Sequence, residues 1–128
     1  MSENANITLV RGFYDSRMDP EVIAEIVAPD LVWDITPGFP NGGVYHGWES
    51  VGRDFFGPIK TAYESLGAHA EQFFADDEDH VFVLGYYHAV TKKGNTADVR
   101  FIHLWTVHNG RLAHLQQAAD SHVLQLLT

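Results

Sequence analysis

The sequence contains no cysteine among its 128 residues, which excludes disulfides and leaves no thiol to act as a nucleophile or metal ligand. No apolar run approaches the ~18 residues of a membrane-spanning helix, and the polar first six residues lack a signal-peptide pattern. Basic residues are scarce, with 8 Lys and Arg against 17 Asp and Glu, for a net charge of −9. Such a chain repels nucleic acid and anionic membranes. We therefore expect a cytoplasmic protein that binds neither.

Common cofactor and metal signatures are also missing. There is no glycine-rich phosphate loop after a strand and no serine elbow. The 8 histidines include no His-x-His pair and no pair at the helical spacing of four residues. The acidic run from Asp76 to Asp79 lacks the glycine and the twelfth-position glutamate of a calcium loop. The sequence thus predicts no cofactor and no metal.

Three segments show helical patterns. Apolar residues recur at helical spacing over residues 7–14. Asp19-Pro20 predicts the N-cap and first residue of a second helix, which we expect Pro29 to end. A third helix is expected over residues 49–66, kinked or split at Gly57-Pro58 because proline interrupts helical hydrogen bonding.

Strand patterns dominate the second half of the chain. We expect strands over residues 31–35, 68–74, 80–91, 97–108 and 112–119. Asn109-Gly110 is a two-residue hairpin signal, and consecutive hairpins form an antiparallel meander. Helices followed by a long meander predict an α+β domain whose helices cover one face of a curved sheet. Gly85, inside one strand, predicts a bulge that helps the sheet bend.

The order of several segments carries a family resemblance. They are Ala28-Pro29-Asp30-Leu31-Val32-Trp33-Asp34, Tyr45-His46-Gly47-Trp48-Glu49, Phe101 to Val107, the Asn109-Gly110 hairpin and Ala119-Asp120. In this order the chain resembles the nuclear-transport-factor-two-like (NTF2-like) superfamily, specifically its SnoaL-like and ketosteroid-isomerase-like branch. The resemblance implies a single domain over residues 1–128, a cone-shaped, cystatin-like half-barrel with a pocket at its open end, and a homodimer. It implies no single activity, because the superfamily includes isomerases, polyketide cyclases, epoxide hydrolases, dehydratases and binding modules.

The resemblance points to two catalytic candidates on separate strands. Asp34 stands at a position similar to that of the general-base aspartate of ketosteroid isomerases, although a strand-end aspartate also commonly binds loop amides. His103 shares a strand face with Phe101 and Trp105, where the isomerases carry an acid that supports the oxyanion. A histidine there could donate a hydrogen bond or shuttle a proton, or it could be a pocket-wall residue without catalytic duty.

Two further candidates have strong structural alternatives. Asp120 resembles the acid/base aspartate of SnoaL-like cyclases, but its place before a short apolar helix favours a helix N-cap, a role that can coexist with the catalytic one. Tyr14 loosely resembles the hydrogen-bond-donor tyrosine of the isomerases; Phe13 could occupy that place, and Tyr14 could be a core residue. A histidine at 103 also departs from the isomerase pattern and argues against true steroid isomerase activity.

Aromatic residues supply the remaining candidates for binding a substrate. These are Trp33, Trp48, Phe55 and Trp105, together with Tyr14. For each of them alone, the sequence favours a place in the core. As a set they favour a small ligand with flat or apolar surface.

These residues support three hypotheses about function. The first is a cofactor-independent acid/base enzyme, of isomerase or cyclase type, that acts on a small hydrophobic carbonyl compound through Asp34, His103 and Asp120. The second is water addition as in epoxide hydrolases, through Asp98, Arg100 and Asp120; strand alternation disfavours it because Arg100 faces away from His103. The third is non-catalytic binding of a small hydrophobic metabolite.

Overall fold

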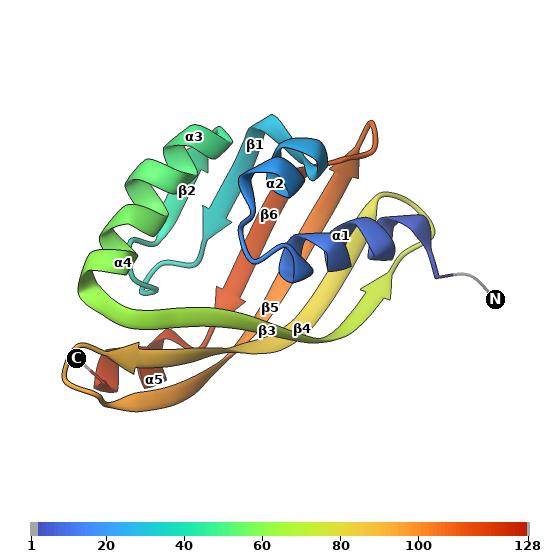
Figure 1. Ribbon diagram of the computed structural model, residues 1–128. Coiled ribbons are helices and arrows are strands. Elements are labelled where there is room, and N and C mark those ends of the chain that lie inside the picture. Colours follow the sequence, from blue (N-terminus) through green and yellow to red (C-terminus); the bar gives the residue numbers. More distant parts are fainter. Residues whose placement is uncertain (1–2, 128) are drawn as a thin grey trace.

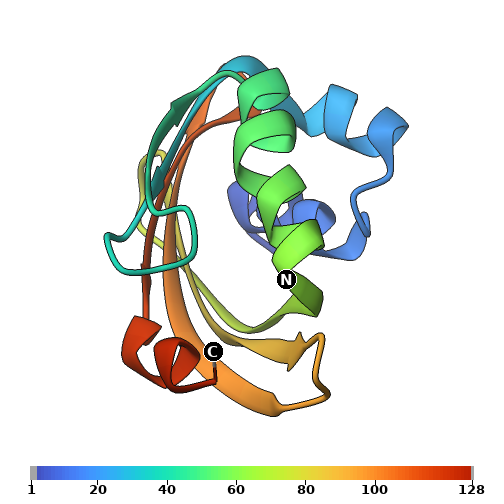
Figure 2. The ribbon, with the colours of Figure 1, turned by 90° about the vertical axis from the view of Figure 1, so that its left-hand side faces the viewer.

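The computed structural model describes residues 3–127 and contains one strongly curved sheet with the helices of the N-terminal half on its concave side (Figures 1 and 2). The strands run in the order β2-β1-β6-β5-β4-β3. Their bounds are β1 Val27–Ile35, β2 Gly43–His46, β3 Tyr63–Ala75, β4 His80–Thr91, β5 Thr96–His108 and β6 Arg111–Ala119. All neighbouring strands are antiparallel except the parallel pair β1 and β6. The predicted α+β class and mainly antiparallel half-barrel are confirmed.

The first two helices begin where capping side chains satisfy free backbone amides. α1 spans Ala5–Asp15 after Asn4, and α2 spans Pro20–Ile26 after Asp19, whose carboxylate accepts from the backbone N–H of Glu21 at 2.9 Å. The prediction that Pro29 ends α2 is wrong. The helix already ends at Ile26, because Val27 takes extended geometry and pairs with β6.

The third helical segment is divided, as the sequence predicted, at Gly57. α3 covers Trp48–Ser50, a π-helical stretch η1 covers Val51–Phe56, and α4 covers Gly57–Ala62. The expected end at residue 66 is wrong, because the chain pairs with β4 from residue 63 onward. β2 was not predicted. A last helix, α5, spans Ser121–Leu126. None of the described helices is long and apolar enough to cross a membrane.

Two glycine positions shape the sheet. At the Asn109-Gly110 turn both residues have positive φ, 49° and 74°, as a two-residue hairpin of the predicted type requires. Gly85 lies where the register of β3 against β4 shifts. A Cβ there would lie 2.1 Å from the carbonyl oxygen of His69, so glycine is needed because the β3 backbone approaches closely.

The core lies between the concave face of the sheet and the helices. Alternate residues of each strand face inward, and on β5 these are Val99, Phe101, His103, Trp105 and Val107, all buried. The face predicted for this strand is confirmed. His103 is the polar member of this inward-facing row, so its imidazole lies inside the molecule and not on the surface.

Candidate functional site

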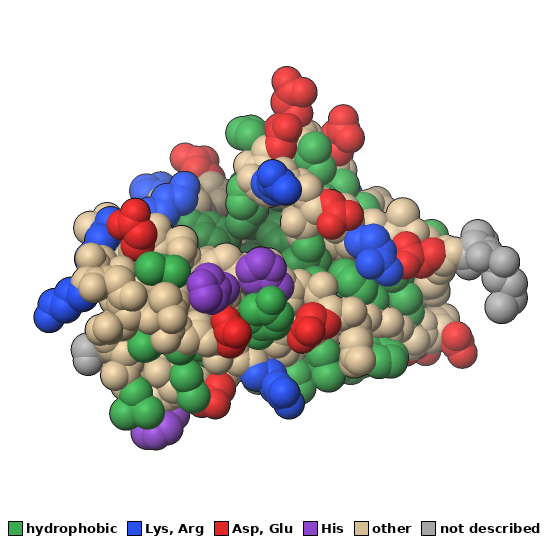
Figure 3. Space-filling model, turned by 60° about the horizontal axis from the view of Figure 1, so that its bottom comes forward, with side chains coloured by type: hydrophobic (Ala, Val, Ile, Leu, Met, Phe, Trp, Pro, Cys, Tyr) green, Lys and Arg blue, Asp and Glu red, His purple; other side chains and the backbone are tan. Residues whose placement is uncertain are grey.

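A cavity of about 650 Å³ opens between the helices and the concave face of the sheet. Its size is that of a small-molecule site. Figure 3 shows a hollow with hydrophobic side chains inside it and Lys or Arg side chains near its edge. Aromatic residues dominate the lining, which consists of Phe13, Tyr14, Arg17, Met18, Trp33, Phe39, Trp48, Gly52, Phe55, Phe56, Ile59, Lys60, Tyr63, Glu64, Ser65, Leu66, Gly67, Ala68, Tyr87 and His103.

A continuous chain of hydrogen bonds forms the polar part of the cavity wall. The Nδ1 of His103 lies 2.5 Å from the hydroxyl of Tyr14, and its Nε2 lies 2.6 Å from the hydroxyl of Tyr87. The Nε1–H of Trp105 donates to the Tyr14 hydroxyl at 2.9 Å, and the Nε2–H of Gln117 donates to the Tyr87 hydroxyl at 2.7 Å. Two phenols are thus held by one imidazole.

Burial keeps every member of this network uncharged near neutral pH. Only 4% of the His103 surface is exposed, and desolvation lowers the pKa of its imidazole from 6.5 to about 3. Desolvation also raises the pKa values of the Tyr14 and Tyr87 hydroxyls. The ring of Phe101 stacks on His103 with centroids 3.8 Å apart. The imidazole is therefore neutral and fixed in orientation.

With Gln117 donating to Tyr87, the network has one hydroxyl proton more than it has acceptors, and this proton is available to a ligand. A neutral imidazole has one N–H and one lone pair, so it donates to one tyrosine and accepts from the other. The tyrosine whose oxygen accepts a hydrogen bond from the imidazole N–H also accepts one from Trp105 or Gln117. Its own O–H has no acceptor within the network. Depending on the tautomer of His103, one hydroxyl, of Tyr14 or of Tyr87, is free to donate into the cavity.

The orientation of the Gln117 amide decides whether a phenolic proton is left without an acceptor. With its nitrogen facing Tyr87, its Oε1 has no hydrogen-bond partner in the described part of the chain. In the opposite orientation Oε1 would accept the Tyr87 proton, and neither phenol would have a spare one. A ligand that accepts the free phenolic proton therefore favours the orientation in which Gln117 donates.

Most of the predicted binding residues meet at this cavity. Tyr14, Trp33, Trp48 and Phe55 line it together with His103. Trp105 does not line it; the ring is fully buried behind Tyr14 and holds the hydroxyl of that residue. Its contribution to a ligand site is therefore indirect.

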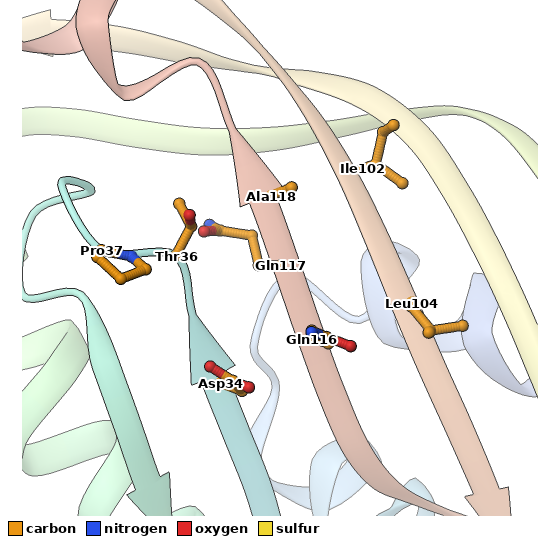
Figure 4. A pocket seen from close by; sticks show the side chains of 8 residues that line it. All are labelled: Asp34, Thr36, Pro37, Ile102, Leu104, Gln116, Gln117 and Ala118. Atoms are coloured by element: carbon orange, nitrogen blue, oxygen red, sulfur yellow. The ribbon is translucent and has the colours of Figure 1, made fainter.

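Asp34 lies on the other face of the sheet. Its neighbours Trp33 and Ile35 are buried in the core, so alternation turns Asp34 outward. There it lines a separate outer groove of about 310 Å³ with Thr36, Pro37, Ile102, Leu104, Gln116, Gln117 and Ala118 (Figure 4). The structure does not bring Asp34 and His103 together.

Asp120 and the residues of the water-addition hypothesis also lie outside the cavity. The carboxylate of Asp120 accepts from the backbone N–H of Val123 at 3.3 Å as the N-cap of α5. Asp98 and Arg100 are exposed on the face of β5 opposite His103, and Asp98 contacts His88 at 2.8 Å. The structure therefore leaves His103 as the one proposed catalytic residue that lines the cavity.

Tyr87 and Gln117 are site residues that the sequence analysis did not single out. Strand alternation could have predicted that both side chains face inward. Tyr87 follows Val83 and Gly85 on one face of β4, and Gln117 follows Leu115 on β6. That they converge on His103 depends on strand register, which pairs Val83 and Gln117 with His103 from its two sides.

One group of possible metal ligands lies outside the cavity lining. The ligand atoms of Asp76, Glu78 and His80, at the turn between β3 and β4, lie within 4.8 Å of one another. His80 Nδ1 already contacts the Asp76 carboxylate at 2.7 Å, and hydrogen bonds from the Glu78 backbone and His80 lower the pKa of Asp76. These contacts account for the cluster as a capped turn. The absence of a metal stays a prediction.

Comparison with known proteins agrees with this architecture. The SnoaL-like domain family matches residues 10–115, and the chain belongs to that family. No curated protein matches it. An NTF2-like protein of unknown function from Burkholderia pseudomallei is 27% identical, with a TM-score of 0.85 and 98% of each chain covered.

Two other solved structures share the fold at lower identity. TerC, crystallised with polyporic acid, is 23% identical with a TM-score of 0.86, covering 97% of this chain and 98% of its own. A putative SnoaL-like polyketide cyclase from Jannaschia is 16% identical with a TM-score of 0.80, covering 99% and 96%. The recognised superfamily and branch are confirmed, and the family supports a small-molecule-binding protein.

Proposed function

We propose that the cavity binds a small hydrophobic carbonyl compound and promotes acid/base chemistry next to its carbonyl group without a cofactor. The observation that carries this proposal is the Tyr14–His103–Tyr87 hydrogen-bond network, whose proton count leaves one phenolic O–H free while Gln117 donates to Tyr87. A buried, oriented O–H that has no acceptor within the network while Gln117 donates to Tyr87 is suited to a carbonyl oxygen, and more so to the oxyanion that forms when an adjacent carbon loses a proton. His103 acts here as a positioning residue.

The proton transfer itself has a simple balance. A base takes a proton from the carbon next to the carbonyl, the C–H electron pair forms a C=C bond, and the oxygen gains the negative charge. Return of a proton to the same or another carbon gives back the ketone or its isomer. Among the described residues, Glu64 is the one carboxylate that lines the cavity, and it is our candidate for the base.

A specific observation favours a second candidate, binding without turnover. Glu64 is exposed, and its carboxylate lies 3.8 Å from Lys92. A solvated and paired carboxylate is a weak base, since it lacks the desolvation that raises basicity at catalytic sites. The two functions share the ligand and differ only in proton transfer.

Binding can be tested with 1-tetralone, a compact aromatic ketone, against tetralin, which lacks only the carbonyl group. We expect 1-tetralone to bind more tightly in isothermal titration calorimetry. Of the variants Tyr14→Phe and Tyr87→Phe, the one that removes the donating hydroxyl should lower ketone affinity about two- to tenfold, the value of one net hydrogen bond. It should leave tetralin affinity unchanged. Equal affinity for the two compounds would contradict the proposed hydrogen bond.

Turnover can be tested with the same ketone in D₂O. An acid/base enzyme would exchange the C2 protons of 1-tetralone for deuterium, which ¹H NMR follows directly. Glu64→Gln should then abolish exchange and retain binding. Exchange no faster than in buffer, with intact binding, would assign the chain to the non-catalytic candidate.

The outer face of the sheet supports the proposal of a homodimer. Phe74, Phe82 and Ile102 are 53%, 40% and 46% exposed there, and Phe82 pairs across the sheet with Phe74 on β3 and with Leu104 on β5. Exposed apolar patches of this kind commonly mark interfaces. Light scattering should give twice the chain mass, and Phe82→Lys should give the monomer mass. A monomeric parent protein would refute this part of the proposal.

A further inference from the structure

Two cationic side chains at the cavity mouth have no assigned role. Arg17 and Lys60 line the cavity and are exposed, so they lie where it meets solvent. Neither belongs to an ion pair in the described part of the chain, whereas Arg11, Arg53 and Lys92 each lie within 4.0 Å of a carboxylate. In a chain of net charge −9, two unpaired cations at one mouth are a local reversal of the overall charge.

The turn that carries Arg17 is conformationally unusual. Arg17 and Met18 both have positive φ, 51° and 63°, a region that costs about 1–2 kcal/mol for a side-chain-bearing residue. Ser16 holds the turn: its hydroxyl donates to Phe13 O at 2.6 Å and accepts from Met18 N–H at 3.1 Å. The backbone is thus fixed in a strained form that presents Arg17 and Met18 to the cavity mouth.

The third charged residue at the mouth does not cancel this effect. Glu64 also lines the cavity, but its carboxylate faces Lys92 at 3.8 Å. Lys92 does not line the cavity, so the Glu64 charge is balanced from outside it. The positive charges of Arg17 and Lys60 are left to act on whatever enters.

We propose that the natural ligand carries an anionic group, such as a carboxylate, which stays at the mouth beside Arg17 and Lys60 while the carbonyl end reaches the tyrosine network. This assignment rests on the proposed function and narrows the ligand class from hydrophobic carbonyl compounds to monoanionic ones. The inner cavity supplies apolar area and one hydrogen-bond donor, and the mouth supplies the countercharge. Such an arrangement would also orient the ligand, carbonyl end first.

The test compares 1-tetralone-6-carboxylate with its methyl ester and with 1-tetralone by calorimetry. We expect the carboxylate to bind most tightly, with an advantage that falls as ionic strength rises. Arg17→Gln and Lys60→Gln should each lower carboxylate affinity about two- to fivefold, as for an exposed ion pair, without changing the affinity for 1-tetralone. Arg100→Gln and Lys93→Gln remove the same charge from exposed sites that do not line the cavity and that, like Arg17 and Lys60, belong to no ion pair among the described residues, and they serve as matched controls.

The outcomes separate this inference from the proposed function. If 1-tetralone and the carboxylate bind equally, or if the control variants lower carboxylate affinity as much as the mouth variants, the anionic ligand is refuted and the carbonyl site stands. If neither compound binds, both proposals are refuted. Circular dichroism of each variant checks that the exposed substitutions leave the fold intact.

Discussion

Acidification should destabilise this fold through His103. The imidazole has a pKa of about 3 in the folded protein and close to 6.5 in the unfolded chain. Below pH 6.5 the unfolded state therefore binds a proton that the folded state does not, and stability falls as pH falls, until the folded-state pKa is reached. Linkage gives a loss of about 2 kcal/mol from this residue between pH 7 and pH 5, and about 3 kcal/mol by pH 4.

The assay is urea unfolding followed by tryptophan fluorescence, with the parent protein and His103→Gln measured at each pH. Glutamine keeps a donor and an acceptor but cannot titrate. Any change in stability that it causes by itself is therefore the same at each pH, and the pH dependence of the variant lacks the His103 contribution. The free energies of unfolding of the two proteins should converge by about 2 kcal/mol from pH 7 to pH 5. Parallel curves would refute the reasoning, and with it the neutral, desolvated imidazole on which the proton count rests.

Further predictions concern backbone and surface positions. Gly85→Ala should unfold the domain or lower its melting temperature strongly, because the new Cβ would lie 2.1 Å from the His69 carbonyl oxygen; a melting temperature within a degree of the parent would contradict the close strand contact. Asp120→Ala should cost about 0.5–2 kcal/mol of unfolding free energy through loss of the α5 cap, with unchanged 1-tetralone affinity by calorimetry. Asp34→Asn should also leave that affinity within twofold of the parent, because the carboxylate faces the outer groove; a tenfold loss would place Asp34 in the ligand site after all.

The sequence predicted those features that depend on local periodicity. The inward face of β5 followed from alternation, and the Asn109-Gly110 turn followed from its residue types, so both were correct. The same alternation, applied to Trp33 and Asp34, shows that the two cannot face one cavity. Asp34 was instead placed by family resemblance, and the structure turns it to the opposite face.

Features that depend on long-range pairing were less accessible. The third helical segment ends at Ala62 because the following residues join β4, a partner more than twenty positions away. Tyr87 and Gln117 reach His103 only because β4, β5 and β6 are neighbours in a particular register. Local propensity carries no information on which strand face meets which, so the resemblance supplied the fold and the structure was needed for the site.

The central claim is that a phenolic proton of the Tyr14–His103–Tyr87 network is free for a ligand carbonyl. Infrared difference spectroscopy of bound 1-tetralone, labelled with ¹³C at the carbonyl carbon, measures this directly, because a hydrogen bond lowers the C=O stretching frequency. We predict a bound frequency well below that in hexane, and a return toward the hexane value when the donating tyrosine is replaced by Phe. A bound frequency equal to that in hexane, or one unmoved in both Tyr14→Phe and Tyr87→Phe, would contradict the account.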